Sequence, residues 1–310
     1  MMRYIFGPVP SRRLGISLGV DIIPFKTCTM DCIYCECGRT TQLTTTRTRF
    51  VDPDLVIDEL RTALAENPHL DYITFSGSGE PTLNKDLGVI IKRIKESTAI
   101  PVAVLTNGAL LYLREVREEL LPADLVLPSL DAVSPQVFEK INQPAAHLDI
   151  DLIIAGLVEF RKEFKGQIRL EVFIVSGLND SEDELAKLYK AIEKIAPHRV
   201  QLNSLDRPPA YPGVTAVDTA RLEQIAAGWK DLLIPVDIIQ RAGNRREIFA
   251  FSKNLEHNIL NTIKRRPLMI DDLEELTGKK RCEIYKYIDI LEKEKKISAK
   301  IVGDKIFYSS

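Results

Sequence analysis

The sequence predicts an α/β fold: a partial TIM-type (β/α)6 parallel barrel over residues 1–250, followed by a small winged helix-turn-helix domain over residues 254–310. Three observations predict this class. Short apolar strands alternate with amphipathic helices along the first part, and polar loops follow several of the strands. After residue 252 the pattern changes to three helices and a hairpin, and a length of 310 residues suits two domains.

The composition is that of a globular protein and excludes several classes. The chain carries 42 Lys+Arg against 44 Asp+Glu, a net charge of -2, and 45% hydrophobic residues. A protein that coats nucleic acid usually has a basic excess, which this chain lacks. The longest uncharged stretch, residues 97–113, contains Pro101 and Gly108, so no membrane helix is expected. The amino terminus lacks the pattern of a secretory signal, and we expect a cytoplasmic protein without a membrane partner.

The first half of the barrel is predicted from strand, loop and helix signals in turn. Residues 17–23 alternate and branch like a strand and lead directly into a cysteine-rich loop. Asp52 and Pro53 then cap and open a helix. A strand over residues 72–75 runs into a Ser-Gly-Ser-Gly-Glu-Pro segment, and a second amphipathic helix is centred on residues 87–94.

The same order repeats in the second half of the barrel. Ser181 and Glu184 form a capping-box pattern ahead of an amphipathic helix, and Pro197 ends that helix. Another helix contains residues 222–229. The remaining strands are predicted over residues 102–105, 125–127, 169–175, 200–202 and 236–239. This regular alternation implies parallel strands joined by right-handed crossovers.

Cysteine placement indicates a metal or iron–sulfur site. Cys28, Cys32, Cys35 and Cys37 fall within a window of ten residues, and Cys282 stands alone. An odd count clustered in this way is not a disulfide framework, and in reducing cytosol clustered thiolates favour zinc or iron. We interpret the window as a ligand loop and expect Cys282 to be a small core residue.

Three further polar loops are expected at the same edge of the sheet. Residues 77–80, 106–108 and 129–131 each follow a predicted strand, as the cysteine loop does. In parallel barrels the loops at the carboxyl ends of the strands carry the chemistry. Each loop taken alone is equally consistent with an ordinary turn, so it is their joint placement that predicts a site.

The carboxyl-terminal part shows the pattern of a winged helix. Three helical stripes precede a turn at residues 302–304 between two short strands, and the part carries 12 Lys+Arg against 10 Asp+Glu. Lys279, Lys280 and Arg281 begin the third helix, where basic residues suit phosphate groups. Acidic residues dilute that charge further along the helix. Nucleic-acid binding and a structural or peptide-docking role therefore both stay open.

The spacing C-x3-C-x2-C, with Tyr34 just before the last cysteine, resembles the signature of the radical S-adenosylmethionine (SAM) superfamily. Residues 4–41 resemble the branch of that superfamily related to the wyosine-tRNA synthases, and the superfamily resemblance covers about residues 15–240. No cysteine precedes Cys28, whereas the synthases that condense pyruvate onto tRNA are expected to carry a further cysteine triad. The resemblance therefore does not transfer their particular reaction.

The resemblance implies a [4Fe-4S] cluster and SAM as cofactors. Cys28, Cys32 and Cys35 would be the cluster ligands, which leaves one iron open for SAM. Reductive cleavage of SAM would give a 5′-deoxyadenosyl radical that abstracts hydrogen from a substrate. A flavodoxin or ferredoxin is the implied electron donor. The implied cofactor-binding residues are Tyr34, Gly77, Ser78, Gly79, Glu80, Asn107, Ser129 and Asp131.

The substrate and the role of Cys37 stay open in the sequence. An RNA base, recruited with the help of the winged helix, is the first candidate substrate, and a peptide or small metabolite is the alternative. A transcription regulator that senses redox state through its cluster is the alternative of another class. Cys37 is either a spare thiol or a fourth ligand that would close the site. Arg12, Arg13 and Arg39 either bind an anionic substrate or the SAM carboxylate, or are solvated loop charges.

Overall fold

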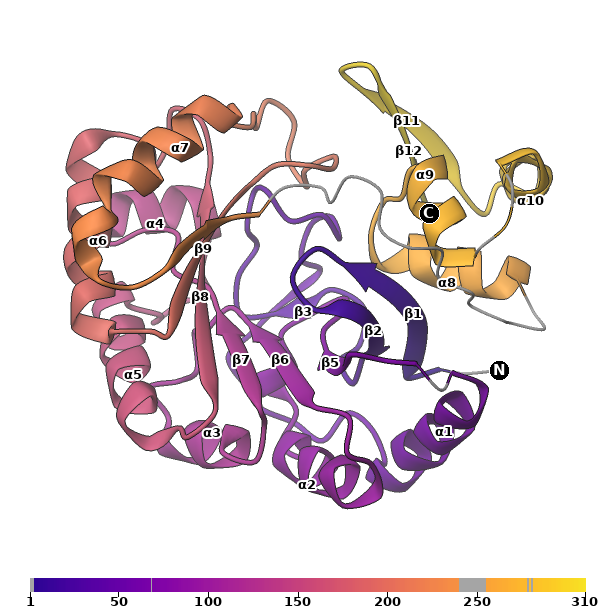
Figure 1. Ribbon diagram of the computed structural model, residues 1–310, viewed down its shortest axis with the longest axis horizontal. Coiled ribbons are helices and arrows are strands. Elements are labelled where there is room, and N and C mark those ends of the chain that lie inside the picture. Colours follow the sequence, from indigo (N-terminus) through magenta and orange to yellow (C-terminus); the bar gives the residue numbers. More distant parts are fainter. Residues whose placement is uncertain (1–2, 68, 240–254, 278, 280) are drawn as a thin grey trace.

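The computed structural model describes residues 3–67, 69–239, 255–277, 279 and 281–310. In this part of the chain, strands rich in apolar residues form an eight-stranded sheet, and its central strands β5, β6 and β7 are buried on both faces. The sheet curves round its own interior, and helices cover its outer face (Figure 1). A smaller group of helices and a hairpin lies beside one edge of the sheet.

The strands follow one another in the sheet in sequence order, from β1 to β10. β1 pairs antiparallel with β2, and each later strand of this sheet pairs parallel with the one before it. This parallel run confirms the predicted α/β class, and β1 and β10 are the two edges of the sheet. The strands are β1 (Ile5–Ser11), β2 (Gly15–Val20), β5 (Tyr72–Phe75), β6 (Val102–Thr106), β7 (Leu125–Pro128), β8 (Gln167–Ile174), β9 (Arg199–Ser204) and β10 (Val236–Ile238).

The helices lie between consecutive strands, as expected for parallel crossovers. Asp52 caps α1 as predicted, because its side chain accepts a hydrogen bond from the Asp54 backbone N–H. The helices of this part are α1 (Pro53–Glu66), α2 (Leu87–Ser97), α3 (Arg114–Leu120), α4 (Pro135–Asn142), α5 (Ile150–Glu163), α6 (Glu182–Ile195) and α7 (Thr219–Gly228), with short 3-10 turns η1 (Pro81–Leu83) and η2 (Lys230–Leu232).

The two faces of the sheet bury different residues. The helix-facing side belongs to the large core, which includes Leu18, Ile73 and Leu170 together with apolar residues of the surrounding helices. Alternate positions on the other face point to the barrel interior. At the amino-terminal end of the strands a small apolar cluster fills this interior, and its buried members are Leu14, Ala103, Leu125 and Leu127. Further along, the interior is polar on the side of β8 and β9.

Strand β1 is an element that the periodicity of the sequence does not reveal. Its Ile-Phe-Gly-Pro-Val-Pro-Ser segment contains two prolines, which are tolerated on an edge strand because one side of that strand needs no ladder hydrogen bonds. The pairing of β1 with β2 is irregular between Phe6 and Val9. Strand β2 ends at Val20, earlier than the predicted residue 23. The next residue, Asp21, accepts hydrogen bonds on its carboxylate from Ser78, in the segment after β5.

The capping box at α6 is present only in part. Ser181 accepts a hydrogen bond from the Glu184 backbone N–H, as predicted. The Glu184 carboxylate does not return to Ser181; it accepts hydrogen bonds from the backbone N–H groups of Val133 (2.6 Å) and Ser134 (2.9 Å). Because these donors lie 50 and 51 residues away, the residues next to Glu184 give no sign of them. Glu184 therefore fastens the loop after β7 to α6.

The carboxyl-terminal part contains three helices and a hairpin in the predicted order. They are α8 (Leu255–Arg265), α9 (Ile270–Thr277), α10 (Arg281–Lys293), β11 (Ser298–Val302) and β12 (Lys305–Ser309). They enclose a separate apolar core, to which Ile259, Leu273, Ile284 and Tyr308 contribute. Helices α8 and α9 contact β1 of the barrel (Figure 1). A winged-helix role for this part stays a prediction.

The start of α10 is less basic than its sequence indicates. The Arg281 guanidinium is paired with the carboxylates of Asp271 and Glu274, both on α9. Its charge is therefore already balanced within the protein. Lys280 and the side chain of Cys282 lie outside the described residues. Within the part that the structure describes, no helix combines the length and apolar character needed to cross a bilayer.

Candidate functional site

The cysteine loop lies at the carboxyl end of β2 and is held by backbone contacts. Its first cysteine belongs to β3 (Thr27–Cys28), which pairs with β4 (Gln42–Leu43). The Cys35 N–H donates to the Cys32 carbonyl at 3.0 Å, and the Ile33 N–H donates to the carbonyl of Ile141 on α4 at 2.9 Å. The loop is thus fixed both to the barrel edge and to a helix that follows β7.

The four thiols of the loop divide into two kinds by their hydrogen bonds. Three of them face nitrogen donors: Asn107 Nδ2 lies 3.5 Å from Cys28 Sγ, Asn142 Nδ2 lies 3.4 Å from Cys32 Sγ, and Lys26 Nζ lies 3.3 Å from Cys35 Sγ. Cys37 instead donates to the carbonyl oxygens of Gly77 and Arg265. The first three sulfurs are therefore hydrogen-bond acceptors in this arrangement, whereas Cys37 is a donor.

The protonation of these thiols is set by burial and by their neighbours. Burial raises the pKa of Cys28 to about 12 and raises that of Cys32 well above its ordinary value. For Cys35, a hydrogen bond from Cys37 and the nearby Lys26 ammonium outweigh burial and lower the pKa to about 6. The reciprocal interaction with Cys35 raises the pKa of Cys37. Of the four thiols in the loop, Cys35 is thus the one whose pKa its neighbours lower.

The thiols do not converge on a single ion. Among the described residues, no group of three His, Cys, Asp or Glu side chains surrounds one metal-ion position. Cys28, Cys32, Cys35 and Cys37 are free, half-buried thiols in this arrangement.

The loop after β5 approaches the cysteine loop closely at two glycines. Gly77 has a φ of +150°, and a Cβ there would lie 2.4 Å from the Asp21 carboxyl carbon. A Cβ on Gly79 would lie 2.1 Å from the carbonyl oxygen of Thr27, the residue before Cys28. Ser78 donates its hydroxyl to Asp21 at 2.8 Å. Side chains are therefore excluded where this loop touches the cysteine loop.

We expect Gly79→Ala to destabilise the metal-free protein by about 1–3 kcal/mol, because the new methyl group must displace the backbone beside Cys28. Gly228→Ala is the matched control: it lies at the end of a helix with nothing within 4 Å of the added Cβ, so it should be neutral or slightly stabilising. Chemical unfolding followed by circular dichroism compares the two. Equal midpoints for the two variants would contradict the close approach.

Glu80 joins two of the predicted loops. Its buried carboxylate accepts hydrogen bonds from the hydroxyls of Thr82 and Thr106, each at 2.6 Å, and from the backbone N–H of Asn107 at 2.7 Å. Burial raises the pKa of Glu80, and these donors oppose that effect. Glu80 therefore holds the loop after β5 against the loop after β6. This carboxylate fixes the geometry of the protein around the site.

Asp131 and Tyr34 form the third connection at the edge of the sheet. The buried Asp131 carboxylate accepts from the Tyr34 hydroxyl, from Asn142 Nδ2 (2.9 Å) and from the backbone N–H of Phe173 (2.9 Å). The Tyr34 ring stacks on Phe173 with 4.0 Å between centroids. Burial raises the pKa of Asp131 to about 6 despite these donors. Ser129, Asp131, Asn107 and Asn142 line one small cavity behind the cysteine loop.

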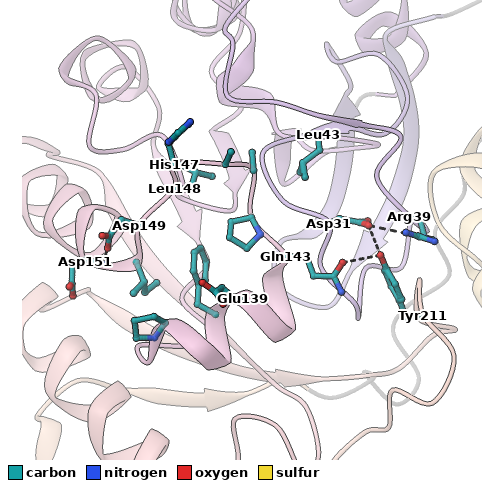
Figure 2. A pocket seen from close by; sticks show the side chains of 16 residues that line it. Asp31, Arg39, Leu43, Glu139, Gln143, His147, Leu148, Asp149, Asp151 and Tyr211 are labelled. Carbon is teal, nitrogen blue, oxygen red and sulfur yellow. Dashed lines mark hydrogen bonds and ion pairs between the residues drawn. The ribbon is translucent and has the colours of Figure 1, made fainter.

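The outer side of the cysteine loop borders a larger cavity of about 730 Å³. Figure 2 shows Tyr211 reaching Asp31 and Gln143 at its edge. The Tyr211 hydroxyl lies 2.6 Å from Asp31 Oδ2 and 2.9 Å from Gln143 Oε1. Arg39 pairs with Asp31 at 3.8 Å and lies over the Tyr211 ring. Arg39 is thus tied to the loop.

The carboxyl-terminal part also reaches this region. Arg265, the last residue of α8, pairs with Asp21 at 3.2 Å and accepts the Cys37 thiol hydrogen bond on its carbonyl. Arg207, after β9, donates to the Pro267 carbonyl at 2.7 Å and lies 3.4 Å from both Glu36 and Asp272. The cysteine loop is therefore in contact with both parts of the chain.

The comparisons with known proteins agree with this arrangement. Residues 22–192 match the family model of the radical SAM superfamily. The chain belongs to the radical SAM superfamily. Members of this superfamily are enzymes that use a [4Fe-4S] cluster and SAM, which they cleave reductively, and they require an electron donor. This protein is accordingly a radical SAM enzyme.

The similar proteins match this chain over different shares of their own length. The chain is 38% identical over 310 residues to GTPase Obg of Brachyspira hyodysenteriae, covering 98% of this chain but only 45% of that protein. It is 31% identical to UPF0026 protein MJ1312 of Methanocaldococcus jannaschii, covering 99% of this chain and 96% of the relative. A structure of TYW1 with a lysine-pyruvate adduct bound is 18% identical with a TM-score of 0.55, covering 73% of this chain and 76% of that chain. This last likeness shows the fold.

Proposed function

We propose that Cys28, Cys32 and Cys35 hold the cluster and that the surrounding loops bind SAM. One observation carries this assignment: each of these three sulfurs faces a nitrogen donor, whereas Cys37 donates to two carbonyl oxygens. The cluster, once bound, supplies the electron that cleaves SAM. The protein holds the ligands in place through Asn107 and Asn142 and excludes water by burial.

The SAM site is proposed at the loops that meet the cysteine loop. Gly77, Ser78 and Gly79 present backbone where side chains are excluded, which suits close approach to a ligand. Glu80 fixes that backbone, and Asn107, Ser129, Asp131 and Tyr34 surround the interior side of the loop. These residues are the ones predicted from the sequence.

The proposed substrate is an RNA base. The resemblance of residues 4–41 to the wyosine-tRNA synthase branch supports it. We further propose that residues 1–250 form the catalytic domain and residues 254–310 a winged helix that helps to recruit the substrate. Since Arg281 is paired with Asp271 and Glu274, the start of α10 does not supply the phosphate contact expected from the sequence. A flavodoxin or ferredoxin is proposed as the electron donor.

The test is reductive cleavage of SAM. Protein reconstituted with iron and sulfide under anaerobic conditions should release 5′-deoxyadenosine and methionine when SAM and dithionite are added. Chromatography of the two products measures the reaction. A redox-sensing regulator would instead bind DNA according to the oxidation state of its cluster and release no 5′-deoxyadenosine. Absence of both products from protein shown to contain four irons would overturn the proposed function.

A further inference from the structure

A basic cavity of about 640 Å³ lies at the open side of the barrel, away from the loops described above. It is formed between the turn that joins β1 to β2 and the interior face of the last strands. Six polar or charged residues line it: Arg12, Arg13, Arg169, Arg199, Gln201 and Asp237. Neither the cluster nor the SAM loops account for this concentration of arginine in a chain whose net charge is -2.

Acidic neighbours balance only part of this charge. Arg199 pairs with Asp237 at 2.6 Å and Arg13 pairs with Glu171 at 2.9 Å. Arg169 donates to the carboxamide oxygen of Gln167 at 3.0 Å and has no carboxylate partner within the described part of the chain. Arg12 lies 3.5 Å from Asp206 and 4.0 Å from Glu36. Arg169 is therefore the guanidinium of this wall that has no carboxylate beside it in the described residues, and it can pair with a bound anion.

One of the residues that line the cavity carries an unsatisfied polar atom. Gln201 is 3% exposed, and its Oε1 has no hydrogen-bond partner among the residues that the structure describes. A buried acceptor left in this state costs about 1–3 kcal/mol, so such atoms are rare unless a ligand or water supplies a donor. Gln201 thus marks a point where a bound molecule gains a hydrogen bond.

A line of interior contacts joins this cavity to the cysteine loop. Next to Gln201 on the same face of β9, Asn203 donates to Glu171 at 2.8 Å. Glu171 lies two residues before Phe173 on β8, and Phe173 stacks on Tyr34 of the cysteine loop. Packed side chains of β8 and β9 therefore connect the wall of the cavity to the proposed cluster site.

We propose that this cavity binds a phosphate group of the substrate, with Arg169 as its main contact, while a hydrogen-bond donor of the same molecule meets Gln201. The inference rests on the proposed function, because it places the substrate of the radical reaction in the barrel interior. Guanidinium groups suit phosphate because their planar N–H pairs match two of its oxygens. The same phosphate chemistry is offered by a free nucleotide and by the backbone of RNA.

The test measures binding directly, without SAM or a reductant. Titration calorimetry compares inorganic pyrophosphate, ATP and a short single-stranded RNA on the wild type, Arg169→Gln and Gln201→Leu. Arg169→Gln should weaken binding of at least one probe about tenfold and reduce its dependence on salt concentration. Arg114→Gln is the control, since that arginine is exposed on α3 and, among the described residues, forms its ion pair with Glu118.

The three probes distinguish the possible sources of the phosphate group. Weakened RNA binding identifies the polymer backbone as the phosphate source, and weakened ATP binding identifies a free nucleotide. Unchanged affinity for all three probes in folded Arg169→Gln protein overturns the inference, as does an equal loss in Arg114→Gln. Cleavage of SAM by the wild type is measured separately, so failure of the proposed function is recognised independently of phosphate binding.

Discussion

Cys32→Ser is expected to lower 5′-deoxyadenosine formation to the level of a protein-free control, whereas Cys37→Ser should retain the activity. Serine is a poor ligand for iron, so the first substitution removes one of three proposed cluster ligands. At position 37 the serine hydroxyl can still donate to the carbonyls of Gly77 and Arg265, as the thiol does. The two variants differ in position only, which makes them a matched pair.

Iron content and product release together check this prediction. Reconstituted Cys32→Ser should bind less iron than the wild type, and Cys37→Ser should bind as much. The opposite pattern, with activity lost only in Cys37→Ser, would show that the wrong three cysteines have been assigned. Equal activity in both variants would show that the reaction does not depend on the cysteine loop.

Arg207→Ala should destabilise the protein by about 1–3 kcal/mol, because it removes a buried guanidinium and leaves the Pro267 carbonyl and the partly buried Asp272 carboxylate without this donor. The Arg207 side chain is 4% exposed and lies within 4.0 Å of carboxylates on Glu36, Asp206 and Asp272. It also donates to the Pro267 carbonyl. The substitution therefore removes the side chain that joins the cysteine loop, the end of β9 and α9.

Two measurements check the Arg207 prediction. Hydrogen exchange of α9 should become faster, and the urea midpoint followed by the fluorescence of Trp229, which is buried in the barrel core, should fall. Arg114→Ala removes an exposed ion pair with Glu118 and should change the free energy of unfolding by no more than about 1 kcal/mol. A similar loss in both variants would mean that Arg207 is no more than an ordinary surface charge.

Local patterns were sufficient to predict most of the barrel. The strand Tyr72–Phe75 was predicted to the residue, and Asp52 caps α1 as expected, because both depend on neighbours in sequence. Strand β1 was missed because its two prolines hide the alternation. The predicted capping role of Glu184 was only half right, because its carboxylate accepts hydrogen bonds from backbone N–H groups far away in the sequence.

In the site, too, features set by neighbouring residues could be predicted, and contacts between distant residues could not. The spacing of the cysteines and the glycines near position 77 can be read from the sequence. Nothing in the sequence indicates that Asn142 donates to Cys32, 110 residues away, or that Tyr211 contacts Asp31, 180 residues away. Such pairings arise only when the strands come together. Lys26 precedes the first cysteine by two residues, but its contact with Cys35 depends on the fold.

The apolar cluster around Leu14, Ala103, Leu125 and Leu127 bounds the space that a reactant can occupy. These four side chains are 0–4% exposed, so the protein itself fills this part of the interior beside β6 and β7. A molecule seated in the neighbouring basic cavity would therefore extend along β8 and β9, and a bulky group directed toward β6 would collide with the cluster.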